Sequence, residues 1–268
     1  MWQISEQVKA IDVKSRLMLN LLTETTQLVA QLEQLSNRRV EFMSVDSLPV
    51  LASLKIARNG APYHVLQYRP SNDPLDYYVA QQVGIVLRMF ELPEEQRFDF
   101  ASDGRGEKEL ESILKALSNL SKNDKQMLPM FAKSVYQWAL MQLRSIPIGM
   151  RVDAWLYESF PAMREYIAKG LGEQQQMNAD VLGKQVGGLS APTNQIGPAA
   201  AYALFTDRLL GTNYKIPFNA AGALEDGRML LYFFDTIKND IYHDRQLVDS
   251  WAKQLGMTNW YQWVPYRT

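Results

Sequence analysis

The sequence contains no cysteine, and its 268 residues include only two histidines, His64 and His243. The first absence excludes disulfides, thiolate zinc sites and cysteine nucleophiles, and it favours an intracellular protein. With only two histidines, the chain has few ways to build a serine triad or a histidine-based metal site. We therefore expect a cytoplasmic protein that does not depend on thiol chemistry.

An excess of charge of one sign is also absent, because 28 Lys and Arg residues are matched by 29 Asp and Glu residues, for a net charge of -1. This balance gives no indication of a polyanion-binding surface, so a nucleic-acid partner is not expected. Long apolar runs are missing as well. The longest, Met229–Phe234, is too short to span a bilayer, and the N-terminus lacks the basic and apolar regions of a secretory signal. The sequence thus predicts a soluble protein without a membrane partner.

The first part of the chain combines helical and strand patterns. Apolar residues at helical spacing over residues 4–37 predict one long helix, or two helices with a break near Asp12 or Thr23. Three runs of strand length follow, at Arg39–Ser44, Val50–Arg58 and Tyr63–Tyr68. Asn59-Gly60 separates the last two runs and predicts a hairpin, because both residues tolerate positive φ.

The rest of the chain is predicted to be mostly helical. Asp73-Pro74 has the pattern of a helix start, and the helix it opens should end near Glu91, before Pro93. Further helices are predicted over 107–121, 124–145, 150–170, 195–211, 227–238, where a strand is the alternative, and 244–256. The polar stretch 172–197 is typical of a helix with a tail, a linker or a lid.

This order of elements predicts an α+β fold, mostly helical, with a small three-stranded sheet next to one prominent helix. We expect a domain over residues 1–170 and a helical C-terminal region over 171–268 that packs on it, with one domain overall as the alternative.

The helix after the third strand carries the most informative motif. It reads D-Y-Y-V-A-Q-Q-V-G-I-V-L-R from Asp76 to Arg88. Because positions i and i+4 share a helix face, Gln81 and Ile85 lie together, with Gln82 beside them. Gly84 lies inside the helix, where glycine costs about 1 kcal/mol relative to alanine, and such a residue indicates close packing.

Together with the extended run before it, this motif resembles the active-site helix of small bacterial zinc-peptidase-like (zincin-like) domains of the ImmA/IrrE type. Those helices read roughly D-Y-x-x-x-H-E-x-G-H-x-x-R. On that pattern Gln81 replaces the first histidine, Gln82 the glutamate and Ile85 the second histidine, whereas Gly84 and Arg88 match. The resemblance covers roughly residues 1–170 and is specific over 63–98.

The replaced residues are those that carry the chemistry of the motif. Two imidazoles on one helix face bind Zn²⁺, and the glutamate takes a proton from the metal-bound water. An amide is a poor zinc ligand and no general base, and isoleucine is neither. The resemblance implies an acidic third ligand on a later helix, for which Asp153 is the best candidate. We therefore predict a catalytically inactive protein (a pseudoenzyme) without a metal or other cofactor.

The resemblance also implies a cleft in which a zinc peptidase holds its substrate as an added strand beside the sheet edge. We expect strand 63–68 to be that edge, and His64, Gln67, Tyr68 and Arg88 to contribute to the binding surface. The expected partner is a protein or peptide. By resemblance, the setting is bacterial or phage-linked regulation.

One alternative is a hydrolase with a non-standard site. Such a site could be built around Asp153, Asp235 and Asp240, or from the two histidines with one carboxylate. Neither arrangement is supported by a spacing signal.

A second alternative is a structural or assembly subunit. The aromatic segment Asn259–Tyr266, together with Trp251, could form a hot spot for a partner, since Trp and Tyr dominate interface energetics. The same segment could equally pack on the core of its own domain, which is the interpretation we favour.

Overall fold

The computed structural model describes residues 19–48, 50–70, 75–102, 104–116, 122–180, 182, 185–186, 189–190 and 193–267. These residues form an α+β fold that is mostly helical and contains a small three-stranded mixed sheet, as predicted. The predictions for residues before Leu19 and for Asp73-Pro74 lie outside the described residues.

The chain divides into two compact units. Unit 1 comprises Met1–Arg97, Trp155–Gly170 and Tyr266–Thr268, and unit 2 comprises Phe98–Ala154 and Leu171–Pro265. One division point lies after Gly170. Residues 98–154 group with the C-terminal part, because a strand at their start pairs with a strand near the end of the chain.

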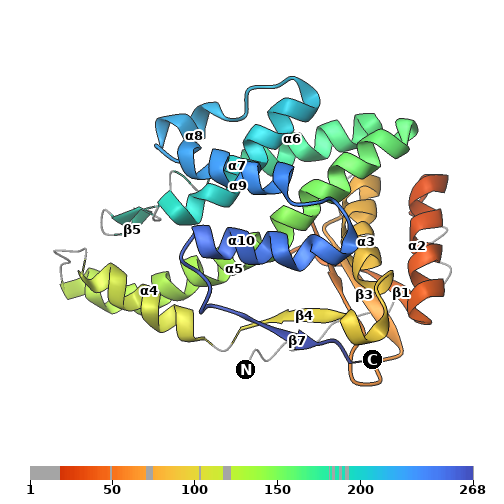
Figure 1. The fold of residues 1–268 in the computed structure, drawn as a ribbon, viewed down its shortest axis with the longest axis horizontal. Helices are drawn as coiled ribbons and strands as arrows, with labels where there is room; N and C mark the ends of the chain where they lie inside the picture. Colours follow the sequence, from red (N-terminus) through yellow and green to blue (C-terminus); the bar gives the residue numbers. More distant parts are fainter. Residues whose placement is uncertain are drawn as a thin grey trace. The chain divides into compact units, whose positions relative to one another are not determined.

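Unit 1 contains the sheet and two helices that pack against each other and against it (Figure 1). Its elements are α2 (Thr23–Ser36), β1 (Arg39–Ser44), β2 (Ala52–Lys55), β3 (Tyr63–Tyr68), α3 (Leu75–Phe90) and the short 3₁₀ helix η1 (Glu94–Gln96). The N-terminal end of α2 is tied to α3, since the backbone N–H of Leu22 donates to the Asp76 carboxylate over 2.7 Å. Asp76, the first residue of the motif, thus has a structural role at a helix end.

The sheet has the strand order β1-β3-β2, with β1 parallel and β2 antiparallel to β3. The predicted hairpin between β2 and β3 is confirmed, and Asn59 and Gly60 have φ values of 53° and 78°. The prediction that strand 63–68 forms an edge is wrong. It is the central strand, because β1 pairs with it in parallel on its other side.

Unit 2 is built from helices and short strands. Its elements, two of which extend into unit 1, are β4 (Phe98–Ala101), α4 (Arg105–Ala116), α5 (Lys122–Ser159), α6 (Arg164–Asp180), β5 (Gln185–Val186), β6 (Leu189–Ser190), α7 (Thr193–Leu210), α8 (Ile216–Ala220), α9 (Leu224–Thr236), η3 (Ile241–His243), α10 (Asp244–Gln254) and β7 (Gln262–Pro265). A further 3₁₀ turn, η2 (Pro161–Met163), precedes α6. The helical interpretation of 227–238 is confirmed by α9.

Two of the predicted helix boundaries are wrong. The helices expected over 124–145 and 150–170 are replaced by α5, which runs through the gap between them, and by α6, which continues to Asp180. Pro147 lies inside α5, where proline normally breaks a helix. The residues on both sides of it, Ile146 and Ile148, are buried, so tertiary packing favours a continuous helix here.

Helices α7 and α9 pack closely against each other in unit 2. A Cβ atom added at Gly227 would lie 2.9 Å from the backbone carbonyl carbon of Ala200. The alanines around that contact, Ala199, Ala200 and Ala203, are fully buried. Small side chains on α7 therefore allow the backbone of α9 to approach closely.

The C-terminal aromatic segment packs within unit 2 up to Pro265, as favoured from the sequence, and Tyr266 belongs to unit 1. Trp251, Trp260 and Tyr261 are buried. Strand β7 pairs with β4, and the ring of Phe100 on β4 stacks on Tyr261 with centroids 4.4 Å apart. These aromatic residues therefore contribute to the core of their own unit.

Candidate functional site

The motif positions lie on the partly exposed face of α3. Gln81, Gln82, Ile85 and Arg88 are each partly exposed, whereas the residues between them are buried. Gly84 is among the buried ones. The shared face predicted from the i, i+4 spacing is therefore the side of α3 that is not packed in the core.

The two glutamines on this face make different contacts. The Gln81 side-chain amide donates to the hydroxyl of Tyr77, one turn earlier on the same helix, over 2.9 Å. The amide oxygen of Gln82 instead accepts from the backbone N–H of Leu54 on β2, over 3.4 Å. Gln82 thus connects the motif helix to an outer strand of the sheet.

The backbone of β2 has a defined outward side. Leu51 accepts from the backbone N–H of Arg69, next to β3, over 3.0 Å. Since antiparallel strands alternate between bonded and non-bonded pairs, Ala52 and Leu54 direct their backbone groups away from β3. The contact from Leu54 to Gln82 agrees with this alternation. Within the described part of the chain, no other strand pairs with the outward side of β2.

Asp153 belongs to unit 2 and is fully buried there. Its carboxylate accepts from the Tyr202 hydroxyl of α7 over 2.7 Å. Among the described residues, no group of three or more His, Asp or Glu side chains is placed to hold a metal ion. The described contacts of Asp153 are those of a buried structural carboxylate.

His64 is fully buried on β3, so the expectation of a surface or edge residue is wrong. Its Nδ1 accepts from the backbone N–H of Ala57 over 2.9 Å. Because this N–H bonds to the imidazole, it is not available to extend the pairing of β2, which ends at Lys55. The carbonyl of Ala57 accepts from the Tyr266 hydroxyl. The Phe90 ring lies edge-on to both the His64 and the Tyr266 rings.

Burial and, to a smaller extent, the positive charge of Arg38 lower the pKa of His64 to about 4, against the opposing charge of Glu33. The imidazole is therefore neutral near pH 7, with its proton on Nε2 because Nδ1 is the acceptor. His64 fixes the chain just beyond β2 and is not available at the surface.

The other two residues predicted on this strand, Gln67 and Tyr68, lie against other parts of unit 1. The Gln67 side-chain amide lies 3.4 Å from the sulfur of Met43 on β1. Tyr68 is buried, and burial raises the pKa of its hydroxyl above the usual value. Strand 63–68 therefore does not provide the expected binding surface. The partly exposed residues that remain near the sheet are Gln82, Ile85 and their neighbours on α3, next to β2.

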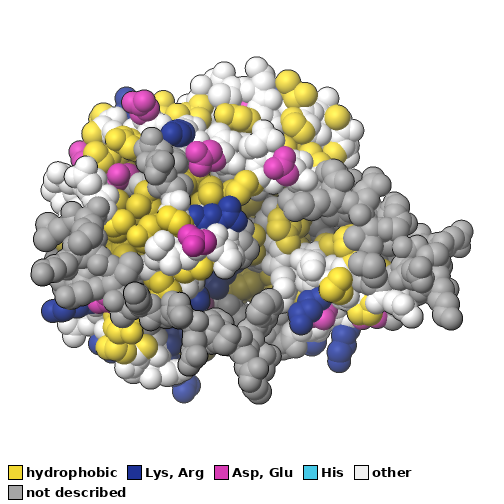
Figure 2. Space-filling model, turned by 180° about the vertical axis from the view of Figure 1, so that it is seen from behind, with side chains coloured by type: hydrophobic (Ala, Val, Ile, Leu, Met, Phe, Trp, Pro, Cys, Tyr) yellow, Lys and Arg dark blue, Asp and Glu magenta, His cyan; other side chains and the backbone are white. Residues whose placement is uncertain are grey.

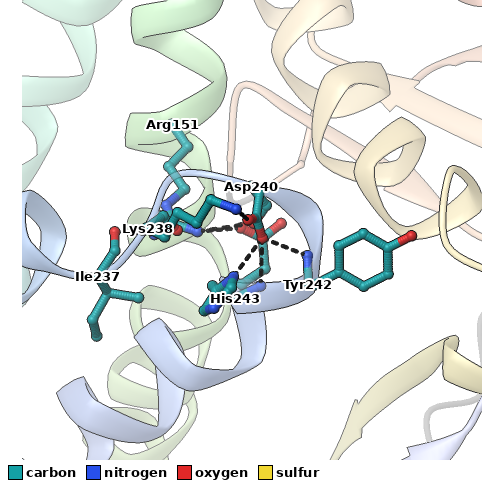
Figure 3. A network of polar contacts seen from close by, with 7 residues as sticks. Arg151, Ile237, Lys238, Asp240, Tyr242 and His243 are labelled. Atoms are coloured by element: carbon teal, nitrogen blue, oxygen red, sulfur yellow. Dashed lines mark hydrogen bonds and ion pairs between the residues drawn. The ribbon is translucent and has the colours of Figure 1, made fainter.

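A buried cation that the sequence did not reveal organises the connection between α9 and α10 (Figure 3). Arg151 on α5 is completely buried, and its guanidinium donates to the backbone carbonyls of Ile237, Lys238 and Asp240 at 2.9–3.3 Å. It also forms an ion pair with Asp244 over 2.7 Å. Because three of these four acceptors are backbone carbonyls, which every residue possesses, a side-chain motif could not have predicted them.

Asp240 fixes the same connection from the outside (Figure 3). Its carboxylate accepts from the backbone N–H groups of Tyr242 and His243 and lies 2.6 Å from Nδ1 of the His243 ring. Hydrogen bonds from His243 and Lys238 hold the pKa of Asp240 below its usual range. The alternative catalytic carboxylates are thus engaged elsewhere, since Asp235 pairs with Arg208 at 2.9 Å.

On the face of the molecule that Figure 2 shows, Lys and Arg side chains and Asp and Glu side chains both lie among neutral and hydrophobic ones. In the part of the chain that the structure describes, no helix is long and apolar enough to cross a membrane. Comparisons of the sequence and structure with protein-family models, curated proteins and solved structures find no match.

Proposed function

We propose that this protein is a catalytically inactive, zinc-peptidase-like module that binds an extended segment of a partner protein along the outward side of β2. The observation that carries the proposal is the outward-directed backbone of Ala52 and Leu54, two largely buried residues next to the partly exposed face of α3. An extended peptide pairs with such backbone groups as an added strand, and nearby side chains select its sequence. This position replaces the edge first expected at strand 63–68.

The residues at the motif positions do not fit the zinc ion that the resemblance implies. Gln81 and Ile85 occupy the places of the two histidines and offer one amide and one hydrocarbon side chain. Gln82 has no basic group near neutral pH and is engaged with β2. A binding role needs none of these missing groups. It requires only the strand edge and the shape of the helix face.

The side chains beside the edge favour a partner segment of mixed character. Ile85 provides an apolar contact, and Lys55 at the end of β2 is exposed and provides a positive charge. Composition supports the remaining parts of the proposal: the absence of cysteine fits a cytoplasmic address, and the balanced charge fits a protein rather than a nucleic-acid partner.

Selection of peptides from a random display library on the purified protein tests this function. Only every second residue of an added strand directs its backbone groups towards β2. Methylation of the backbone nitrogens of those residues should therefore weaken binding of the peptide, whereas methylation of the residues between them should have little effect. Equal sensitivity at all positions would contradict strand addition. Elemental analysis should find far less than one zinc per chain, and stoichiometric zinc would favour a hydrolase.

A further inference from the structure

Both outer strands of the sheet have an outward N–H group covered by a side chain from a helix. The Val40 N–H on β1 donates to the Glu33 carboxylate of α2 over 2.7 Å. The Leu54 N–H on β2 donates to the Gln82 amide oxygen over 3.4 Å. The two strands are therefore protected by the same kind of contact, which blunts a sheet edge against unwanted pairing.

The two contacts differ in strength. A carboxylate at 2.7 Å is a charged acceptor at short range, and such hydrogen bonds are roughly twice as strong as neutral ones. A neutral amide at 3.4 Å lies beyond the usual range of N–H···O distances. The contact on β1 should hold firmly, whereas that on β2 can be released at little cost.

The Gln82 side chain also resembles the backbone carbonyl of an added strand, which would take its place. Its carbonyl accepts from Leu54 N–H, as the backbone carbonyl of an added strand would. We propose that Gln82 is a displaceable cap, which covers Leu54 N–H in the free protein and releases it to the bound segment. This inference rests on the function proposed for β2, and it assigns the regulation of that edge to one side chain.

A neighbouring residue provides a matched control. Gln81 has the same side chain, also lies partly exposed on α3, and its amide donates to the Tyr77 hydroxyl on the same helix. Replacing Gln81 with alanine removes an amide of equal size without touching the N–H of Leu54. Any effect specific to the cap should appear on replacing Gln82 and not on replacing Gln81.

The first experiment needs no ligand. Amide hydrogen exchange measured by NMR should show Leu54 N–H exchanging about threefold faster in Gln82→Ala than in the wild type, consistent with the loss of one weak hydrogen bond. Gln81→Ala should leave the Leu54 rate unchanged. An unchanged Leu54 rate in Gln82→Ala would overturn the cap.

The second experiment uses the peptides selected from the display library. Because no cap needs to be displaced, Gln82→Ala should bind them about threefold more tightly, and Gln82→Glu, which supplies a charged acceptor, should bind them several-fold more weakly. Weaker binding by Gln82→Ala would overturn the cap and make Gln82 a direct contact. If no displayed peptide binds the wild-type protein, the function proposed for β2 fails, while the Leu54 exchange rates still decide whether Gln82 covers that N–H.

Discussion

Acidification should destabilise unit 1 through a single residue, His64. Its ring is buried, and its Nδ1 accepts from the backbone N–H of Ala57 over 2.9 Å. A proton on Nδ1 would turn that acceptor into a donor that faces another donor. Burial of the ring is also the main reason why the pKa of His64 is lowered to about 4.

The size of the effect follows from the two protonation equilibria. The unfolded chain has the ordinary histidine pKa of 6.5, so between pH 6.5 and pH 4 the unfolded state binds more protons than the folded state. The contribution of the neutral ring to stability is therefore complete above pH 6.5 and is lost as the pH falls towards 4. For these two pKa values the loss amounts to about 2 kcal/mol at pH 5 and about 3 kcal/mol when complete.

Urea unfolding followed by far-UV circular dichroism at about pH 7.5 and about pH 5 measures this loss, in the wild type and in His64→Asn. Asparagine retains an acceptor oxygen near the position of Nδ1 and does not titrate in this range. The wild type should lose about 2 kcal/mol more than the variant on acidification. All other titratable groups are the same in the two proteins, so the difference between them reports on His64. An equal loss in the two proteins would refute the role of His64.

Two further predictions concern unit 2. Replacing Arg151 with methionine leaves the carbonyls and the carboxylate around it without their cation, so the free energy of unfolding from urea titrations should fall by about 3–5 kcal/mol. The half-exposed Arg208, which pairs with Asp235 at 2.9 Å, should cost less than about 1 kcal/mol when it is replaced by methionine. Similar losses at both positions would contradict the structural role of Arg151. Replacing Gly227 with alanine should lower the melting temperature. Overpacking against Ala200 costs about 1–3 kcal/mol, which is at least as much as the roughly 1 kcal/mol gained in helix propensity. A higher melting temperature would show that α7 and α9 can move apart to make room for the methyl group.

Local sequence signals were enough for the hairpin and for the motif helix. Asn59-Gly60 tolerates positive φ at both positions, and the residues around it alternate as strands do. The exposed face of α3 followed from the i, i+4 spacing of Gln81 and Ile85. In these cases the determining interactions lie within a few residues of one another.

Pairing between strands that lie far apart in the sequence could not be predicted from such local signals. Strands β4 and β7 are four residues each, too short to show a period, and they lie at opposite ends of unit 2 in the sequence. The central position of β3 depends on its parallel pairing with β1, which no local pattern specifies. For the same reason His64 was assigned to the surface.

The candidate site was only partly predictable. The loss of metal ligands at the motif can be read directly from residue types, but the contact between Gln82 and Leu54 depends on how α3 lies against β2. Arg151 stands two residues before Asp153 in the sequence, yet its partners are mostly backbone carbonyls, which every residue possesses. Its role depends on the fold and not on neighbouring side chains.

The central claim is that the outward side of β2 binds an extended peptide next to α3. Chemical-shift mapping of isotopically labelled protein with a peptide selected from the display library tests it most directly. The amides of Ala52–Lys55 and the side-chain amide of Gln82 should shift together as the peptide is added. Shifts confined to another surface, such as the exposed Met229 and Tyr232 on α9, with no change along β2, would contradict it.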